Sequence, residues 1–231
     1  MSMISDNLAR IRERIEKAAV SAQTPPESIR LIAVSKTKPI ELIEEAISAG
    51  LTDFGENRVQ ETVEKYDVIG DRVRWHLIGH LQTNKAKHAA RVCHMIQSVD
   101  NLALGQELDR RLRPLKRVLP VLVQVKTSKE ETKSGVEPDR ASELVEQLAG
   151  LSSLSLQGLM TIPAYTPDPE EARPSFQLLR ALKDQISDLR IPGVDLRYLS
   201  MGMTHDFEIA IQEGANMVRV GTALFGARDA L

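Results

Sequence analysis

The stretch that decides the fold is Leu31-Ile32-Ala33-Val34-Ser35-Lys36-Thr37-Lys38-Pro39. Its four apolar residues predict a buried strand over 31–34, and Pro39 suits the first turn of a helix that ends near Gly50. A doubly wound open sheet that binds a dinucleotide would carry a Gly-rich GxGxxG turn after this strand. Because the segment 35–39 contains no glycine, the sequence favours a closed barrel over an open sheet.

The same order of strand and helix recurs along the whole chain. After 31–34, strands are predicted at 53–55, 74–78, 95–99, 119–125, 154–162, 196–200 and 217–221. Helical patterns cover 58–67, 102–110, 139–148, 170–189 and 206–214, and one further helix precedes them at about 6–22. Alternation of this kind requires parallel strands with right-handed crossovers. Eight units in 231 residues predict a (β/α)8 TIM barrel, an α/β fold in a single domain over 1–231 with an extra N-terminal helix.

Composition excludes several classes of function. The formal net charge of −2 and the aromatic content of 3% argue against a nucleic-acid partner. The chain has no apolar run of membrane-spanning length and no signal-peptide core in its first ten residues, so we expect a cytoplasmic protein with no membrane partner. The single cysteine, Cys93, excludes an internal disulfide framework and a CxxC metal site. A monomeric protein that binds a small molecule is the expectation.

The predicted barrel places its working groups at the C-terminal ends of the strands. The seventh and eighth strands are followed by Ser200-Met201-Gly202-Met203-Thr204 and by Gly221-Thr222-Ala223-Leu224-Phe225-Gly226. Small residues at these two ends commonly hold a phosphate, because backbone N–H groups and helix dipoles there favour an anion. The alternative is that these glycines only permit tight turns. Two such turns side by side favour phosphate binding.

Lys36 and Arg219 indicate which class of phosphorylated molecule binds at the C-terminal mouth of the predicted barrel. A lysine partly withdrawn from water can attack a carbonyl and form a Schiff base, whereas a solvated lysine paired with Glu56 would carry no chemistry. Together with a phosphate site, Lys36 suggests either a Schiff-base aldolase or a pyridoxal 5′-phosphate (PLP) protein. If Arg219 faces the interior, it can donate a hydrogen bond to a pyridine nitrogen and keep the ring a poor electron sink. The alternative is an arginine paired with a carboxylate between helix and sheet.

Eight consecutive motifs carry a family resemblance, and they occur in the family's order. They are Ala33–Pro39, Phe54–Glu61, Trp75–Lys85, Ser98–Asp100, Lys133–Gly135, Gly158–Thr161, Leu199–Met203 and Met217–Gly226. These segments resemble the pyridoxal phosphate homeostasis proteins, also called the proline synthetase co-transcribed homologues. The resemblance covers nearly the whole chain. It implies a barrel similar to the N-terminal domain of alanine racemase, of PLP fold type III.

The resemblance also implies roles for particular residues. Lys36 matches the lysine that carries PLP as an internal aldimine, and Arg219 matches the arginine at the pyridine nitrogen. Further cofactor contacts are implied for Ser200, Gly221 and Thr222 at the phosphate, and for Asn57 and Met201. No catalytic residue and no metal ligand is implied. The implied function is vitamin B6 and amino- and keto-acid homeostasis by a carrier or regulator without turnover, with PLP-dependent apoenzymes as recipients.

The alternative function is a low-activity amino-acid racemase. Racemisation needs a proton donor or acceptor on each face of the substrate, and Lys36 would serve only one. In alanine racemase a tyrosine of a second domain serves the other face, whereas this sequence ends at Leu231, just after the eighth unit. Tyr165 is the only tyrosine near a strand's C-terminal end. The sequence therefore predicts a protein that is not an enzyme.

A few positions depart from the family pattern or leave a choice open. Lys126 stands where Gln-Val-Asn is more usual, and Thr204-His205 replaces a serine-led pair. The Thr204 hydroxyl is expected to cap the next helix, and His205 to add a titrating group near the phosphate. The segment 126–133 is predicted to be a rim loop that gates the pocket. His76 and His80 resemble a metal pair, but hydrogen-bonded histidines near the rim are favoured over zinc ligands.

Overall fold

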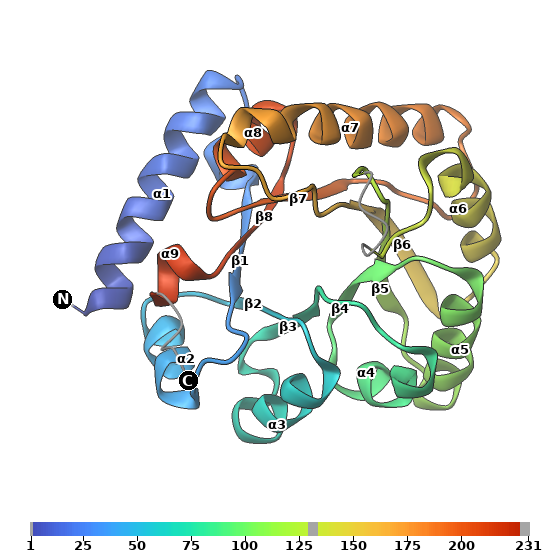
Figure 1. Cartoon of the computed structure of the whole chain (residues 1–231). Helices are drawn as coiled ribbons and strands as arrows, with labels where there is room; N and C mark the ends of the chain where they lie inside the picture. Colours follow the sequence, from blue (N-terminus) through green and yellow to red (C-terminus); the bar gives the residue numbers. More distant parts are fainter. Residues whose placement is uncertain (1, 129–133, 227–231) are drawn as a thin grey trace.

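Eight parallel strands close into a barrel in the computed structural model, which describes residues 2–128 and 134–226. Each strand pairs with the next along the chain, and the eighth pairs with the first (Figure 1). The strands are β1 (Arg30–Val34), β2 (Asp53–Glu56), β3 (Arg74–Leu77), β4 (Met95–Val99), β5 (Leu119–Gln124), β6 (Leu154–Met160), β7 (Tyr198–Met203) and β8 (Met217–Val220). The predicted (β/α)8 TIM barrel is confirmed.

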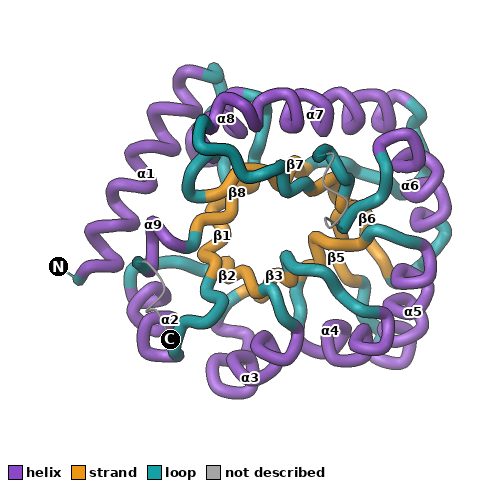
Figure 2. Tube along the Cα trace, in the orientation of Figure 1, coloured by secondary structure: helices purple, strands orange, loops and turns teal. Residues whose placement is uncertain are grey.

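Helices form a ring around the barrel, as Figure 2 shows. They are α2 (Ile40–Ser48), α3 (Val59–Ile69), α4 (Ala86–Val92), α5 (Leu102–Leu112), α6 (Ala141–Ala149), α7 (Arg173–Asp188), α8 (Phe207–Gln212) and α9 (Thr222–Phe225). The additional helix, α1 (Met3–Ser21), packs against α8 and α9. No helix in the described part of the chain is both long and apolar enough to span a bilayer.

The additional helix begins earlier than the apolar spacing alone predicts. The expected start was near residue 6, but Ser2 caps the helix by accepting a hydrogen bond from the Ser5 backbone N–H. Ile4, in the first turn, is fully buried and continues the apolar face formed by Leu8 and Ile11. The cap and this first buried contact therefore extend the helix by one turn at its N-terminal end.

The seventh strand differs most from its predicted bounds. It covers Tyr198–Met203 instead of 196–200, and its pairing with β8 shifts register between Ser200 and Met203. Gly202 has φ +89°, and a Cβ atom there would lie 2.6 Å from the Ala210 Cβ. This glycine therefore allows the strand end to approach α8 closely. Strand periodicity alone does not reveal such an irregular continuation.

Successive residues of a strand point to opposite faces of the sheet, so the core of the barrel has two layers. The larger apolar cluster lies between sheet and helices and includes Val218 and Val220. A smaller cluster fills the barrel interior and is formed by Ile32, Met95, Leu122, Met160 and Met217. Because Arg219 lies between two residues of the outer layer, its side chain faces the interior, as the alternation predicts.

Candidate functional site

Lys36 lies in the turn that follows β1, at the C-terminal mouth of the barrel. The side chain is partly buried, and β1 is paired with both β2 and β8. The next residue, Thr37, has φ +62°, in the left-handed region that non-glycine residues seldom adopt. Its backbone N–H donates to Glu61 Oε1 at 2.5 Å, so a contact from α3 holds the strained turn in place.

A buried ion cluster lies directly behind this turn. Lys65 Nζ donates to the Ser35 carbonyl, to Glu56 Oε1 and to Glu61 Oε1, each at 2.7 Å. The Ser35 hydroxyl donates to the same Glu56 oxygen at 2.6 Å. Burial, which outweighs the attraction of Lys65, raises the pKa of Glu56 to about 6. Glu56 thus pairs with Lys65, and we call Ser35, Glu56, Glu61 and Lys65 the ion cluster.

Arg219 is a buried cation whose hydrogen-bond partners are neutral. Its Nη1 donates to Ser200 Oγ and its Nη2 to the Thr161 carbonyl, both at 2.7 Å. Within residues 2–128 and 134–226, no carboxylate lies within ion-pair distance of the guanidinium. Burial lowers the pKa of Arg219 to about 10, so the group stays charged at neutral pH. Such a cation is complemented by a ligand that brings an anion or an acceptor nitrogen.

Ser200 and Met201 are adjacent but face opposite sides of the sheet. Ser200 is fully buried in the interior, where its hydroxyl accepts from Arg219 and donates to Gln97 Oε1 at 2.6 Å. The Met201 side chain is part of the outer core between sheet and helices. A ligand in the mouth would therefore meet the backbone of Met201 and not its side chain.

The segments after β7 and β8 lie side by side. The Ala223 N–H donates to Thr204 Oγ1 at 3.5 Å, which joins the two turns directly. A Cβ atom at Gly221 would lie 3.2 Å from the Val34 carbonyl oxygen, so this turn also abuts the end of β1. Thr222, beside it, is exposed. Gly221, Thr222 and the turn bearing Lys36 therefore share one corner of the mouth.

The helix-based part of the phosphate prediction needs correction. The helices α8 and α9 have only six and four residues, so an anion here would depend on individual N–H groups and hydroxyls more than on helix dipoles. Asp206, not Thr204, stands at the N-cap of α8, and the Thr204 hydroxyl serves the neighbouring turn instead. His205 Nε2 contacts the Pro167 carbonyl at 3.0 Å, on the side of the β6 loop.

Asn57 lies at the end of β2, which is separated from β8 only by β1. It follows β2, is half-buried, and lines a cavity of about 140 Å³ together with His80 and Lys85. A Cβ atom at Gly79 would lie 2.3 Å from the Asn57 carbonyl oxygen, so the glycine allows the two strand ends to pack closely. The structure therefore associates Asn57 with the ends of β2 and β3.

The rim segment 126–133 falls partly outside the described residues, as does Lys133 of the predicted motif. Its first residue, Lys126, forms an ion pair with Glu137 at 3.2 Å. Gln124 Nε2 donates to the Ser134 carbonyl at 2.8 Å, which ties the end of β5 to the far side of the segment. Gating by this loop stays a prediction.

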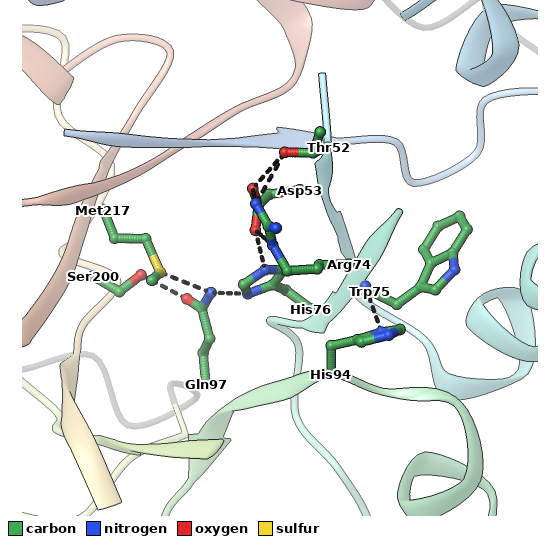
Figure 3. Close-up of polar contacts among 9 residues, drawn as sticks. All are labelled: Thr52, Asp53, Arg74, Trp75, His76, His94, Gln97, Ser200 and Met217. Atoms are coloured by element: carbon green, nitrogen blue, oxygen red, sulfur yellow. Dashed lines mark hydrogen bonds and ion pairs between the residues drawn. The ribbon is translucent and has the colours of Figure 1, made fainter. Parts of the chain in front are cut away.

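Two interior residues, His76 and Gln97, were assigned no role in the mouth from the sequence. His76 is 1% exposed inside the barrel and not at the rim, with Nε2 2.9 Å from Asp53 Oδ1 and Nδ1 3.1 Å from Gln97 Nε2 (Figure 3). His80 is exposed, 3.5 Å from Asp100. In the part of the chain that the structure describes, no three His, Cys, Asp or Glu side chains gather as metal ligands. A polar residue between apolar neighbours in a strand, the pattern around Arg219, was the available signal for His76, whereas Gln97 is followed by Ser98 and lacks it.

Comparison with known proteins identifies the family. The model of the alanine racemase N-terminal domain matches residues 6–229. A pyridoxal phosphate homeostasis protein from Aquifex aeolicus is 45% identical over 224 residues, which cover 96% of this chain and 97% of that protein. The chain belongs to this family. The resemblance inferred from the eight motifs is thereby confirmed.

Two solved structures show how closely the family fold is kept. The PipY protein of Synechococcus elongatus, solved with PLP bound, is 38% identical and superposes with a TM-score of 0.85, covering 97% of this chain and all of PipY. The alanine racemase of Clostridium difficile is 16% identical with a TM-score of 0.76, covering 97% of this chain and 58% of the racemase. The second likeness concerns the fold alone, and it matches the expected similarity to the alanine racemase barrel.

Proposed function

We propose that this homeostasis-family protein binds PLP at the C-terminal mouth of its barrel, through a Schiff base with Lys36. The observation that carries the proposal is Arg219, a buried cation without a carboxylate partner in the described chain. A pyridine nitrogen is an acceptor that complements it. PipY, which is similar over its whole length and was solved with PLP, supports the same ligand.

The residues of the mouth fit the parts of this cofactor. Lys36 Nζ would bond the aldehyde carbon with loss of water, in a turn that the ion cluster holds from behind. Gly221, Thr222 and the backbone of Met201 lie in the corner that would receive the phosphate, and Asn57 lies at the end of β2, on the other side of β1. Ser200 would act there mainly through Arg219, because its hydroxyl already bonds Gln97. When bound, PLP supplies an electron-withdrawing ring and a reactive aldehyde.

The proposed role is to hold and deliver the cofactor without turnover. Arg219 can only donate to the pyridine nitrogen and so leaves the ring unprotonated, which weakens stabilisation of a carbanion. Tyr165, the one candidate for a second proton donor, is 79% exposed, with its ring beside that of His205. The name of the curated relatives, homeostasis proteins, agrees with a carrier or regulator. PLP-dependent apoenzymes are the proposed recipients.

The visible absorption spectrum tests the cofactor and its lysine. Purified protein incubated with PLP is expected to show an imine band that borohydride reduction converts into a stable adduct, located on Lys36 by peptide mass spectrometry. Lys36→Ala should lose the band and the adduct. Lys38→Ala, which removes a lysine of the same turn, should keep both. A wild-type protein that takes up no PLP would overturn the proposal.

Deuterium incorporation tests the absence of turnover. The PLP-loaded protein is incubated in D2O with L- and D-amino acids, and α-deuteration is followed by NMR. We expect no incorporation beyond that caused by free PLP at the same concentration. Incorporation that depends on Lys36, is lost in Tyr165→Phe and is accompanied by conversion of one enantiomer into the other would instead establish the racemase.

A further inference from the structure

A chain of buried polar side chains crosses the barrel interior below the proposed cofactor site. It starts at Arg219, and Ser200, Gln97, His76 and Asp53 follow at distances of 2.7, 2.6, 3.1 and 2.9 Å between the bonded atoms. Figure 3 shows its last four members. None of the five is more than 5% exposed, and they come from five different strands. We call these five residues the interior chain.

The direction of every hydrogen bond in the interior chain follows from Asp53. Burial raises the pKa of Asp53, but hydrogen bonds from His76 and Arg74 outweigh it and hold the pKa below its ordinary value. Arg74 donates to this carboxylate through Nε at 2.8 Å and through Nη2. An ionised carboxylate can only accept hydrogen bonds. The His76 nitrogen that faces it, Nε2, must therefore carry a proton.

His76 passes this constraint on to Gln97. Burial lowers the pKa of His76, and the positive charges of Arg30 and Arg74 oppose a second proton, although Asp53 favours one. With one proton placed on Nε2, Nδ1 has only a lone pair and needs a donor. Gln97 must therefore turn its NH2 group to His76, and this group also contacts the Met217 sulfur at 3.1 Å. The Gln97 carbonyl oxygen then faces Ser200.

Ser200 completes the sequence of constraints. Its single hydroxyl proton goes to Gln97, so the oxygen presents a lone pair to Arg219 Nη1. If the Gln97 amide were reversed, its NH2 group would compete with the guanidinium for this oxygen. Arg219 would then keep only its contact with the Thr161 carbonyl and would be free to turn. Asp53, at one end of the interior chain, thus determines the orientation of the Arg219 guanidinium at the other end.

We propose that Asp53, His76 and Gln97 are positioning residues that fix, through the Ser200 hydroxyl, the orientation of the Arg219 guanidinium. The effect on the cofactor rests on the proposed function, whereas the proton positions are a property of the protein alone. The interior chain would keep the guanidinium preorganised, so that no reorientation cost falls on cofactor binding.

Nitrogen-15 NMR of the cofactor-free protein tests the proton positions. Because burial lowers the pKa of His76, we expect its ring to be the neutral Nε2–H form at pH 7 and above. In Asp53→Asn the new amide can donate to Nε2, so the ring is expected to change to the Nδ1–H form. Arg74→Gln removes the arginine that contacts Asp53 but keeps the Asp53 carboxylate and its hydrogen bond from the Thr52 hydroxyl, and should retain the Nε2–H form. A wild-type His76 that is protonated twice, or carries its proton on Nδ1, would overturn the proposal.

PLP affinity and the absorption band of the loaded protein test the consequence. Asp53→Asn and Gln97→Leu are each expected to weaken PLP binding about tenfold and to shift the band, while the borohydride adduct on Lys36 persists. Arg74→Gln and Met95→Leu, an interior packing control beside His76, should stay within about twofold of wild type. Thermal melts establish that each variant is folded. If a variant does not fold, the nitrogen-15 NMR measurement of His76 in the wild-type protein still tests the proton positions. Unchanged affinity and band in a folded Gln97→Leu would refute the positioning role, whereas a wild type that binds no PLP would refute only the proposed function.

Discussion

Two buried sets of charges flank the mouth of this barrel, and they are built in opposite ways. In the ion cluster, Lys65 meets two carboxylates at 2.7 Å, so the buried cation has its partners within the protein. Arg219 is as deeply buried, yet its contacts in the described chain are a hydroxyl and a carbonyl. Matched charges fix the position of a turn, whereas an unmatched charge is costly until a ligand complements it. The first set therefore has a structural role, whereas the second supports the proposed binding site.

Lys65→Met is the substitution with the largest expected effect on stability. It leaves Glu56 buried without its cation, and breaking such a pair costs about 3–5 kcal/mol of unfolding free energy. Urea denaturation of the cofactor-free protein measures it. Lys17→Met, which breaks an exposed pair with Glu13, is the control and should cost far less than Lys65→Met, because solvent screens this pair. Equal losses in the two variants would show that the ion cluster is not structural.

Arg219→Met should give the opposite pattern to Lys65→Met. Because the guanidinium has no carboxylate partner in the described chain, replacing it with an apolar side chain should change the unfolding free energy by less than about 1 kcal/mol. PLP affinity should fall roughly 10- to 100-fold through loss of a charged hydrogen bond. Urea denaturation and spectroscopic titration measure the two quantities. A large loss of stability with normal PLP affinity would reverse the assignment of Arg219 and the ion cluster.

The smallest expected effect is the pH dependence that Glu56 gives to stability, and Glu56→Gln, which has no carboxyl group at this position, is its reference. Since the folded protein raises the pKa of Glu56 to about 6, its protonated form is favoured by folding. The stability contribution is present below the ordinary carboxyl pKa and is lost as pH rises through about 6. Relative to Glu56→Gln, wild type is therefore expected to lose up to about 2 kcal/mol between pH 4.5 and pH 7. Parallel curves of unfolding free energy against pH would contradict this.

Local pattern was enough to predict most of the fold. The eight apolar runs and the helical spacing between them specify the strands, their order and the barrel, because parallel strands must be joined by crossover helices. The helix α4 escaped notice because its buried face consists largely of alanines, which give little amphipathic contrast. The shifted end of β7 escaped because it depends on Gly202 meeting α8, a contact between separate elements.

The site was predicted less completely than the fold. Strand alternation correctly placed Arg219 in the interior, and the turn after β1 identified Lys36 as a residue of the mouth. The side-chain directions of Met201 and His205 were not available, because they depend on the outer core and on the β6 loop. The roles assigned to the seven predicted cofactor residues stay predictions.

What the sequence determined by itself was the order of elements, the family, and which side chains alternate into the barrel, because these depend on local spacing and on residues at consecutive positions. Only the tertiary structure decided that Lys65 pairs with Glu56 while Arg219 pairs with no described carboxylate, and that His76 and Gln97 connect Asp53 to Ser200. The physical reason is that hydrogen bonds and ion pairs depend on distances of about 3 Å between atoms from different strands. Only closure of the barrel brings those atoms together.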